Sequence, residues 1–149
     1  MDTTNGIPWL DDEDPLSLVG QYTRDLQEIM APAAATIPTS STFTGSLLAV
    51  AFGPLVTITG ATQRTGGSVS TQGDAFGIVD TWAIPPRFRP SSDMNTTAVM
   101  MTSGNISSRR FDCTITTTGR IVGYVTSESG ALANSGWLKF SAIYPVTLA

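Results

Sequence analysis

Short runs of alternating apolar and polar residues, separated by turn residues, fill the sequence from Phe43 onward. Alternation with a period of two is typical of strands that bury one face. The runs lie at 43–51, 54–62, 67–72, 76–84, 96–102, 109–118, 120–126 and 136–146. Because no stretch with a helical period separates them, consecutive strands are expected to pair antiparallel. The pattern predicts a mainly β fold, an antiparallel sandwich or barrel.

The clearest predicted hairpin is FDCTITTTGRIVGYV, in which two β-rich runs flank TTGR. Gly119 can supply the positive φ that a tight turn requires. Cys113 alternates onto the same face as Phe111 and Ile115, whereas Asp112 falls on the opposite face. Cys113 is therefore expected to be a buried core residue rather than a reactive thiol. As the only cysteine, it also excludes an intrachain disulfide.

One short helix is predicted ahead of the β region. Asp14 is a good N-cap, Pro15 takes the first helical position, and Pro32 ends the helix. The helix has an apolar stripe at Leu18, Val19, Tyr22, Leu26 and Ile29. The sequence shows no second helix to receive this stripe, so it must pack on the β domain, on copies of itself or on another protein.

These patterns divide the chain into three segments. Residues 1–31 are expected to form an acidic N-terminal segment and the helix. Residues 32–42 are small, uncharged and proline-containing, which is typical of a semi-extended linker. Residues 43–149 form the β-sandwich domain.

Charge is sparse and unevenly distributed. Charged residues make up 13% of the chain, and the net charge is −4. The acidic residues concentrate before residue 29, at Asp2, Asp11, Asp12, Glu13, Asp14, Asp25 and Glu28. This balance argues against nucleic-acid binding, which requires clustered Lys and Arg. No apolar run is long enough to cross a membrane, and the acidic N-terminus lacks the features of a signal peptide.

The sequence offers little for catalysis. It has no histidine, which removes the commonest general base near neutral pH. The acids of the β region do not form a close pair; they are Asp74, Asp80, Asp93, Asp112 and Glu128. No phosphate-binding or calcium-binding loop is present. We expect a non-enzymatic protein with no cofactor and no metal site.

Two features of the β region have alternative interpretations. Arg109-Arg110 could hold an anionic ligand, but such a pair more often ends a solvated strand. Trp82 and Trp137 lie in β-rich runs, where packing in the core or between subunits is the expected role. Exposed aromatic residues that stack on sugars are the functional alternative.

The stretch WAIPPRFRPSSD is predicted to be a structural corner. Ile84 ends a strand, and the two prolines that follow cannot donate hydrogen bonds to a sheet. Phe88 then packs inward, while Arg87 and Arg89 point away from the core. Two arginines alone make a poor basic patch, and the stretch fits a polyproline ligand only loosely.

The order of these motifs resembles the C-terminal domain of phage tail fibres and minor tail proteins of the actinobacteriophage type. In that family a strand ends in a segment like L-P-x-G-Y-R-P, and a G-N type turn and a T/D-x-x-G turn follow before a last strand. The matching positions here are Ile84-Pro85, Arg87 to Pro90, Gly104-Asn105, Thr118-Gly119, Gly136-Trp137 and Ser141 to Pro145. Arg87 stands where the family has glycine.

The resemblance implies a homotrimeric β-sandwich of the jelly-roll or tumour-necrosis-factor-like kind. The N-terminal helix would then bundle with two copies of itself through Leu18, Val19, Tyr22, Leu26 and Ile29. The acidic segment would dock on another virion protein, with an anchor at Ile7, Pro8, Trp9, Leu10, Asp11 and Asp12. The residues that bind a receptor cannot be named from the sequence.

Two functions fit this resemblance, and both place the protein in the virion. The first is a tail fibre or tail-tip protein whose β-sandwich binds a host-surface glycan, with trimerisation giving avidity. The second is a capsid decoration protein or head fibre that is anchored through its N-terminus and has no receptor of its own.

Overall fold

The computed structural model describes residues 2–4, 7–9, 20–21, 24, 31–102 and 105–147. Within them the protein is mainly β and every paired strand is antiparallel, which confirms the predicted fold class. Strands β1 (Asp2–Thr4) and β2 (Ile7–Trp9) form a separate two-stranded sheet.

The remaining strands form one eight-stranded sheet with the order β3-β4-β5-β10-β7-β8-β9-β6. Their bounds are β3 (Ala33–Pro38), β4 (Phe43–Phe52), β5 (Leu55–Arg64), β6 (Ala75–Val79), β7 (Met94–Thr102), β8 (Asn105–Ile115), β9 (Ile121–Tyr124) and β10 (Trp137–Pro145). A single turn of 3-10 helix, η1 (Pro86–Phe88), lies between β6 and β7. The last strand therefore occupies a central position in the sheet.

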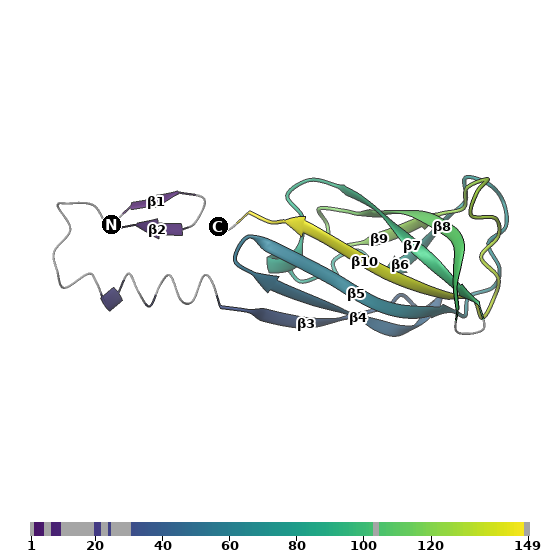
Figure 1. Cartoon of the computed structure of the whole chain (residues 1–149), viewed down its shortest axis with the longest axis horizontal. Helices are drawn as coiled ribbons and strands as arrows, with labels where there is room; N and C mark the ends of the chain where they lie inside the picture. Colours follow the sequence, from purple (N-terminus) through teal and green to yellow (C-terminus); the bar gives the residue numbers. More distant parts are fainter. Residues whose placement is uncertain are drawn as a thin grey trace.

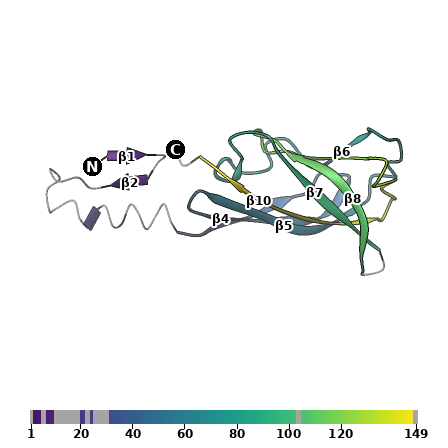
Figure 2. The same ribbon diagram turned by 45° about the horizontal axis from the view of Figure 1, so that its top comes forward.

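The sheet folds over on itself into two layers, one with β4, β5 and β10 and the other with β6 to β9 (Figure 1, Figure 2). Strand β10 pairs with β5 along its whole length, but with β7 only from Trp137 to Phe140, so the layers diverge beyond that point. On the far side, Ser40 after β3 connects to β6. Its amide donates to the Ile78 carbonyl (2.8 Å) and its hydroxyl to the Gly77 carbonyl (2.6 Å). The sheet is thus nearly closed into a barrel.

The core lies between the layers and follows the alternation of the sequence. In β10, for example, the residues facing inward are Leu138, Phe140, Ala142 and Tyr144, and each is buried. Phe76 of β6 packs edge-on against Phe111 of β8, with 5.5 Å between ring centroids, so the contact spans the intervening strand β9. Cys113 is 1% exposed, which confirms its predicted core position.

The prediction that residues 32–42 form a linker is wrong, because most of this segment is a strand. Residues 33–38 form the edge strand β3, whose register pairs Ala33 with Ala51 and Pro38 with Ser46. Ile37 is fully buried, so this strand contributes to the core. The β domain therefore begins before Phe43.

Two predicted strands differ from the structure: one is absent and one is shorter than predicted. Residues 67–72 contribute one isolated bridge, between Val69 and Leu132, instead of a strand. The run 76–84 stops pairing at Val79, because the chain then turns and Trp82 adopts a positive φ of 70°.

The corner prediction is confirmed, with a different local geometry. Ile84 and Phe88 are buried, although Ile84 lies in the turn rather than at a strand end. The Tyr144 hydroxyl donates to the Phe88 carbonyl and fastens β10 to the corner. Arg89 does not point into open solvent: its Nε donates to the Ile84 carbonyl (2.7 Å), and its guanidinium stacks 5.1 Å from the centre of the Trp82 ring.

Neither tryptophan packs in the core, and the other expected role, packing between subunits, stays a prediction. Trp82 is 64% exposed and Trp137 is 43% exposed. Both lie in alternating stretches, but the positive φ at Trp82 and the outward register of Trp137 direct them away from the core.

Candidate functional site

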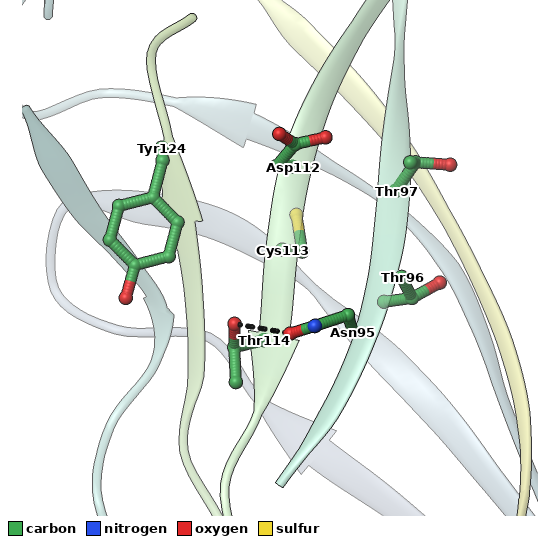
Figure 3. Close-up of a pocket in the computed structure, with 7 residues that line it drawn as sticks. All are labelled: Asn95, Thr96, Thr97, Asp112, Cys113, Thr114 and Tyr124. Atoms are coloured by element: carbon green, nitrogen blue, oxygen red, sulfur yellow. Dashed lines mark hydrogen bonds between the residues drawn. The ribbon is translucent and has the colours of Figure 1, made fainter. Parts of the chain in front are cut away.

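A hollow of about 510 Å³ lies on the layer formed by β7, β8 and β9 (Figure 3). Its lining residues are Asn95, Thr96, Thr97, Asp112, Cys113, Thr114 and Tyr124. Most of these side chains carry a hydroxyl, amide or carboxylate group, and Tyr124 adds an aromatic ring. Because the side chains come from adjacent strands of one sheet, the sheet itself fixes their spacing.

Strand register explains how these residues meet. Asn95 of β7 pairs with Thr114 of β8, and Thr97 pairs with Asp112. Asp112 is in turn opposite Tyr124 of β9. Side chains that are directly opposite on neighbouring strands lie about 5 Å apart at Cβ, so Thr97, Asp112 and Tyr124 form a row across the sheet.

One hydrogen bond within the hollow orients the side-chain amide of Asn95. The Thr114 hydroxyl donates to the side-chain oxygen of Asn95 at 3.2 Å (Figure 3). The Asn95 amide nitrogen is on the other branch of the same group and is therefore directed away from Thr114. The pair presents an oriented amide donor on the same face of the sheet as the Asp112 carboxylate.

Asp112 dominates the electrostatics of the hollow. Of the described residues that line it, Asp112 alone is charged at neutral pH. Burial raises the pKa of the Cys113 thiol to about 12, so this residue is a neutral part of the lining. Arg110, two residues before Asp112 on β8, is exposed on the same face, next to the hollow.

This arrangement suits binding better than catalysis. A carboxylate, an amide, hydroxyls and an aromatic ring can hold a polar ligand through hydrogen bonds and stacking. Among the residues that the structure describes, no group of three or more His, Cys, Asp or Glu side chains gathers to hold a metal ion. Within the same residues, no helix is long and apolar enough to span a bilayer.

The residues predicted for anchoring and trimerisation are only partly described. Ile7, Pro8 and Trp9 form strand β2. Leu10, Asp11 and Asp12 lie outside the described residues, as do all the stripe residues, Leu18, Val19, Tyr22, Leu26 and Ile29. In the predicted helix, Gly20, Gln21 and Arg24 are described and are helical. The helix and both predicted contact sets stay predictions.

The sequence analysis did not predict the hollow, although the alternation of one strand indicated part of its lining. The alternation FDCTI places Asp112 and Thr114 on the outward face of one strand. The other members come from β7 and β9, and only the strand register, which the sequence does not state, brings them together.

Comparisons with known proteins show a similar fold in a solved structure. No family model matches the chain, and no curated protein sequence matches it. Among solved structures, the chain is similar to the head domain of phage bIL170, described as a receptor-binding domain of lactococcal phages. The TM-score is 0.57 at 18% sequence identity, over 76% of this chain and 97% of that chain. At this identity the likeness shows the fold, and it does not support the narrower resemblance to actinobacteriophage tail fibres.

Proposed function

We propose that the protein is a non-enzymatic phage virion protein whose β domain binds a glycan on the host surface. The observation that carries this proposal is the fold: the likeness covers 97% of a phage receptor-binding head domain. The hollow on β7, β8 and β9 supports it, because a concave polar site with an exposed aromatic ring suits a polar ligand.

Self-association into a homotrimer is part of the proposal. The outer face of β4, β5 and β10 exposes Leu48, Phe52, Leu55 and Ile143, with Ile143 at 70%. Of the described outward-facing residues of these strands, only Lys139 is charged. Covering such an apolar face with copies of the chain is favourable. Its strands form the layer opposite the one that carries the hollow (Figure 2). Three copies would therefore leave their hollows accessible.

The trimer would also explain how weak contacts suffice for attachment. Once one domain of a trimer has bound a surface glycan, the other domains search at a high effective concentration. Millimolar single-site affinity then becomes useful avidity. The predicted N-terminal helix, bundled through its apolar stripe, would add a second set of contacts between subunits.

We further propose that the acidic segment before the helix anchors the trimer on another virion protein. Deletion of residues 1–14 should abolish incorporation into particles, while the β domain stays folded. Truncated protein that still copurifies with particles would show that the anchor lies elsewhere.

A binding assay tests the receptor role directly. Fluorescently labelled protein should bind cells of the bacterium on which the phage grows, and unlabelled protein should displace it. If the protein is found on particles by immunogold electron microscopy at the capsid and does not bind cells, the capsid decoration or head fibre role replaces the receptor role.

A further inference from the structure

We propose that the hollow on β7, β8 and β9 binds a neutral saccharide ring, stacked on Tyr124 and hydrogen-bonded to Asp112. This inference rests on the proposed receptor-binding function and assigns it a site and a ligand class. It starts from the row of side chains that the sheet fixes in register, Thr97, Asp112 and Tyr124.

Tyr124 provides the apolar half of the site. Its side chain is 38% exposed, although large aromatic side chains in strands usually bury their rings. Figure 3 shows the ring on β9, with Asp112 and Thr114 on the neighbouring strand β8. A pyranose presents C–H groups on one face and hydroxyls around its rim, so it can cover the ring while its hydroxyls reach β8.

Asp112 and its neighbours provide the polar half. A carboxylate accepts two hydrogen bonds side by side, which matches two adjacent hydroxyl donors on a sugar ring. The oriented Asn95 amide can donate to a sugar oxygen, since its own oxygen is engaged by Thr114. The Thr97 hydroxyl, opposite Asp112, can donate or accept.

The charge of the lining favours a neutral ligand. Asp112 is the charged member of the lining and would repel a carboxylate or phosphate that entered the hollow. The nearby arginines lie outside the lining: Arg110 is farther along β8, and the Arg120 guanidinium lies against Gly77 of β6. The volume of about 510 Å³ is within the range of small-ligand sites and accommodates one or two sugar rings.

The test is an NMR titration of the full-length protein with D-glucose, N-acetyl-D-glucosamine and D-glucuronate at millimolar concentrations. A neutral sugar should shift the amide resonances of β7, β8 and β9, and glucuronate should bind at least about fivefold more weakly. Asp112→Asn should weaken binding about tenfold, because it removes a charged acceptor. Tyr124→Thr should weaken it about fivefold, and Tyr124→Phe should keep it within about twofold.

Asp80→Asn is the matched control, since it removes an exposed carboxylate outside the hollow and should leave binding unchanged. The amide spectra of the free variants verify that each is folded. The proposal is overturned if neither neutral sugar shifts these strands, if glucuronate binds as well as they do, or if Asp112→Asn binds like the unmodified protein.

Cell binding separates this inference from the function on which it rests. If the unmodified protein binds host cells and Asp112→Asn and Tyr124→Thr bind equally well, the hollow is not the site and the receptor role stands. If the unmodified protein does not bind host cells, the receptor role itself fails.

Discussion

Gly123 of β9 faces the ring of Phe76 in the core. A methyl group at this position would overlap that ring. The ring is itself held edge-on by Phe111 and contacts Phe43, with 6.1 Å between the ring centroids of Phe43 and Phe76. Because both neighbours restrain the ring, only glycine allows β9 to approach the core this closely.

Gly123→Ala should therefore lower the free energy of unfolding by about 2 kcal/mol, measured by urea denaturation. Gly77→Ala is the matched control on the neighbouring strand β6. Its added methyl group would meet only the end of the flexible Arg120 side chain, at 3.4 Å, so the change should stay within about 0.5 kcal/mol. Equal losses in the two variants would contradict the packing argument.

The buried thiol of Cys113 makes stability depend on alkaline pH. Burial raises its pKa to about 12, whereas a thiol in the unfolded chain titrates near its ordinary value of about 8.5. A raised folded-state pKa contributes stability that is fully present below the unfolded value and is lost as the pH rises toward 12.

The destabilisation caused by Cys113→Ala should accordingly shrink above about pH 8.5, by up to about 1.4 kcal/mol per pH unit. Urea unfolding of both proteins at neutral and alkaline pH measures this difference, in which the titration of the other groups cancels. A difference that is constant with pH would show that the thiol is not protected from ionisation in the folded protein.

Among the elements, β3 decides where the β domain starts. Ile37 on this edge strand is fully buried, and Thr36 beside it is exposed. Ile37→Ala should cost about 3 kcal/mol of unfolding free energy in thermal or urea denaturation, whereas Thr36→Ala should cost less than about 0.5 kcal/mol. A flexible linker would instead tolerate both substitutions equally.

The sequence predicted those elements whose alternation is strong. In β10 every second residue is buried, and in β8 the predicted inward face of Phe111, Cys113 and Ile115 is the observed one. The prediction failed for β3, because AAATIP begins with three alanines and ends in proline, which are depleted in strands, and its pairing with β4 comes from tertiary context.

The candidate site was harder to predict than the fold. Asn95, Asp112 and Tyr124 lie on separate strands, and each alone is an ordinary outward-facing polar or aromatic residue. Their juxtaposition depends on the register of two strand pairs, and a shift by one residue would move Asp112 to the other face.

For the whole molecule, the outer face of β4, β5 and β10 is apolar and that of β7, β8 and β9 carries the polar hollow. This difference leads to a prediction about assembly. Ile143→Arg places a charge in the middle of the apolar face of β4, β5 and β10 and should convert a trimer into a monomer without unfolding it. Light scattering measures the mass, and circular dichroism verifies the fold. Ala75→Arg on β6, in the other layer, should remain trimeric.

A monomeric mass for the unmodified protein at micromolar concentration would contradict the proposed homotrimer. A trimer that survives Ile143→Arg would instead indicate that the subunits associate through another surface, such as the predicted N-terminal helix.

The central position of β10 has a consequence for biosynthesis. Strands β5 and β7 have no pairing with each other; each pairs with β10, which follows all other strands in the sequence. A nascent chain can form the β4–β5 and β7–β8 hairpins early, but the strand pairing that links β5 to β7 requires β10. The sheet is therefore completed only once β10 has been synthesised, and a stop codon before residue 137 would release two half-sheets with exposed edges that are prone to aggregate.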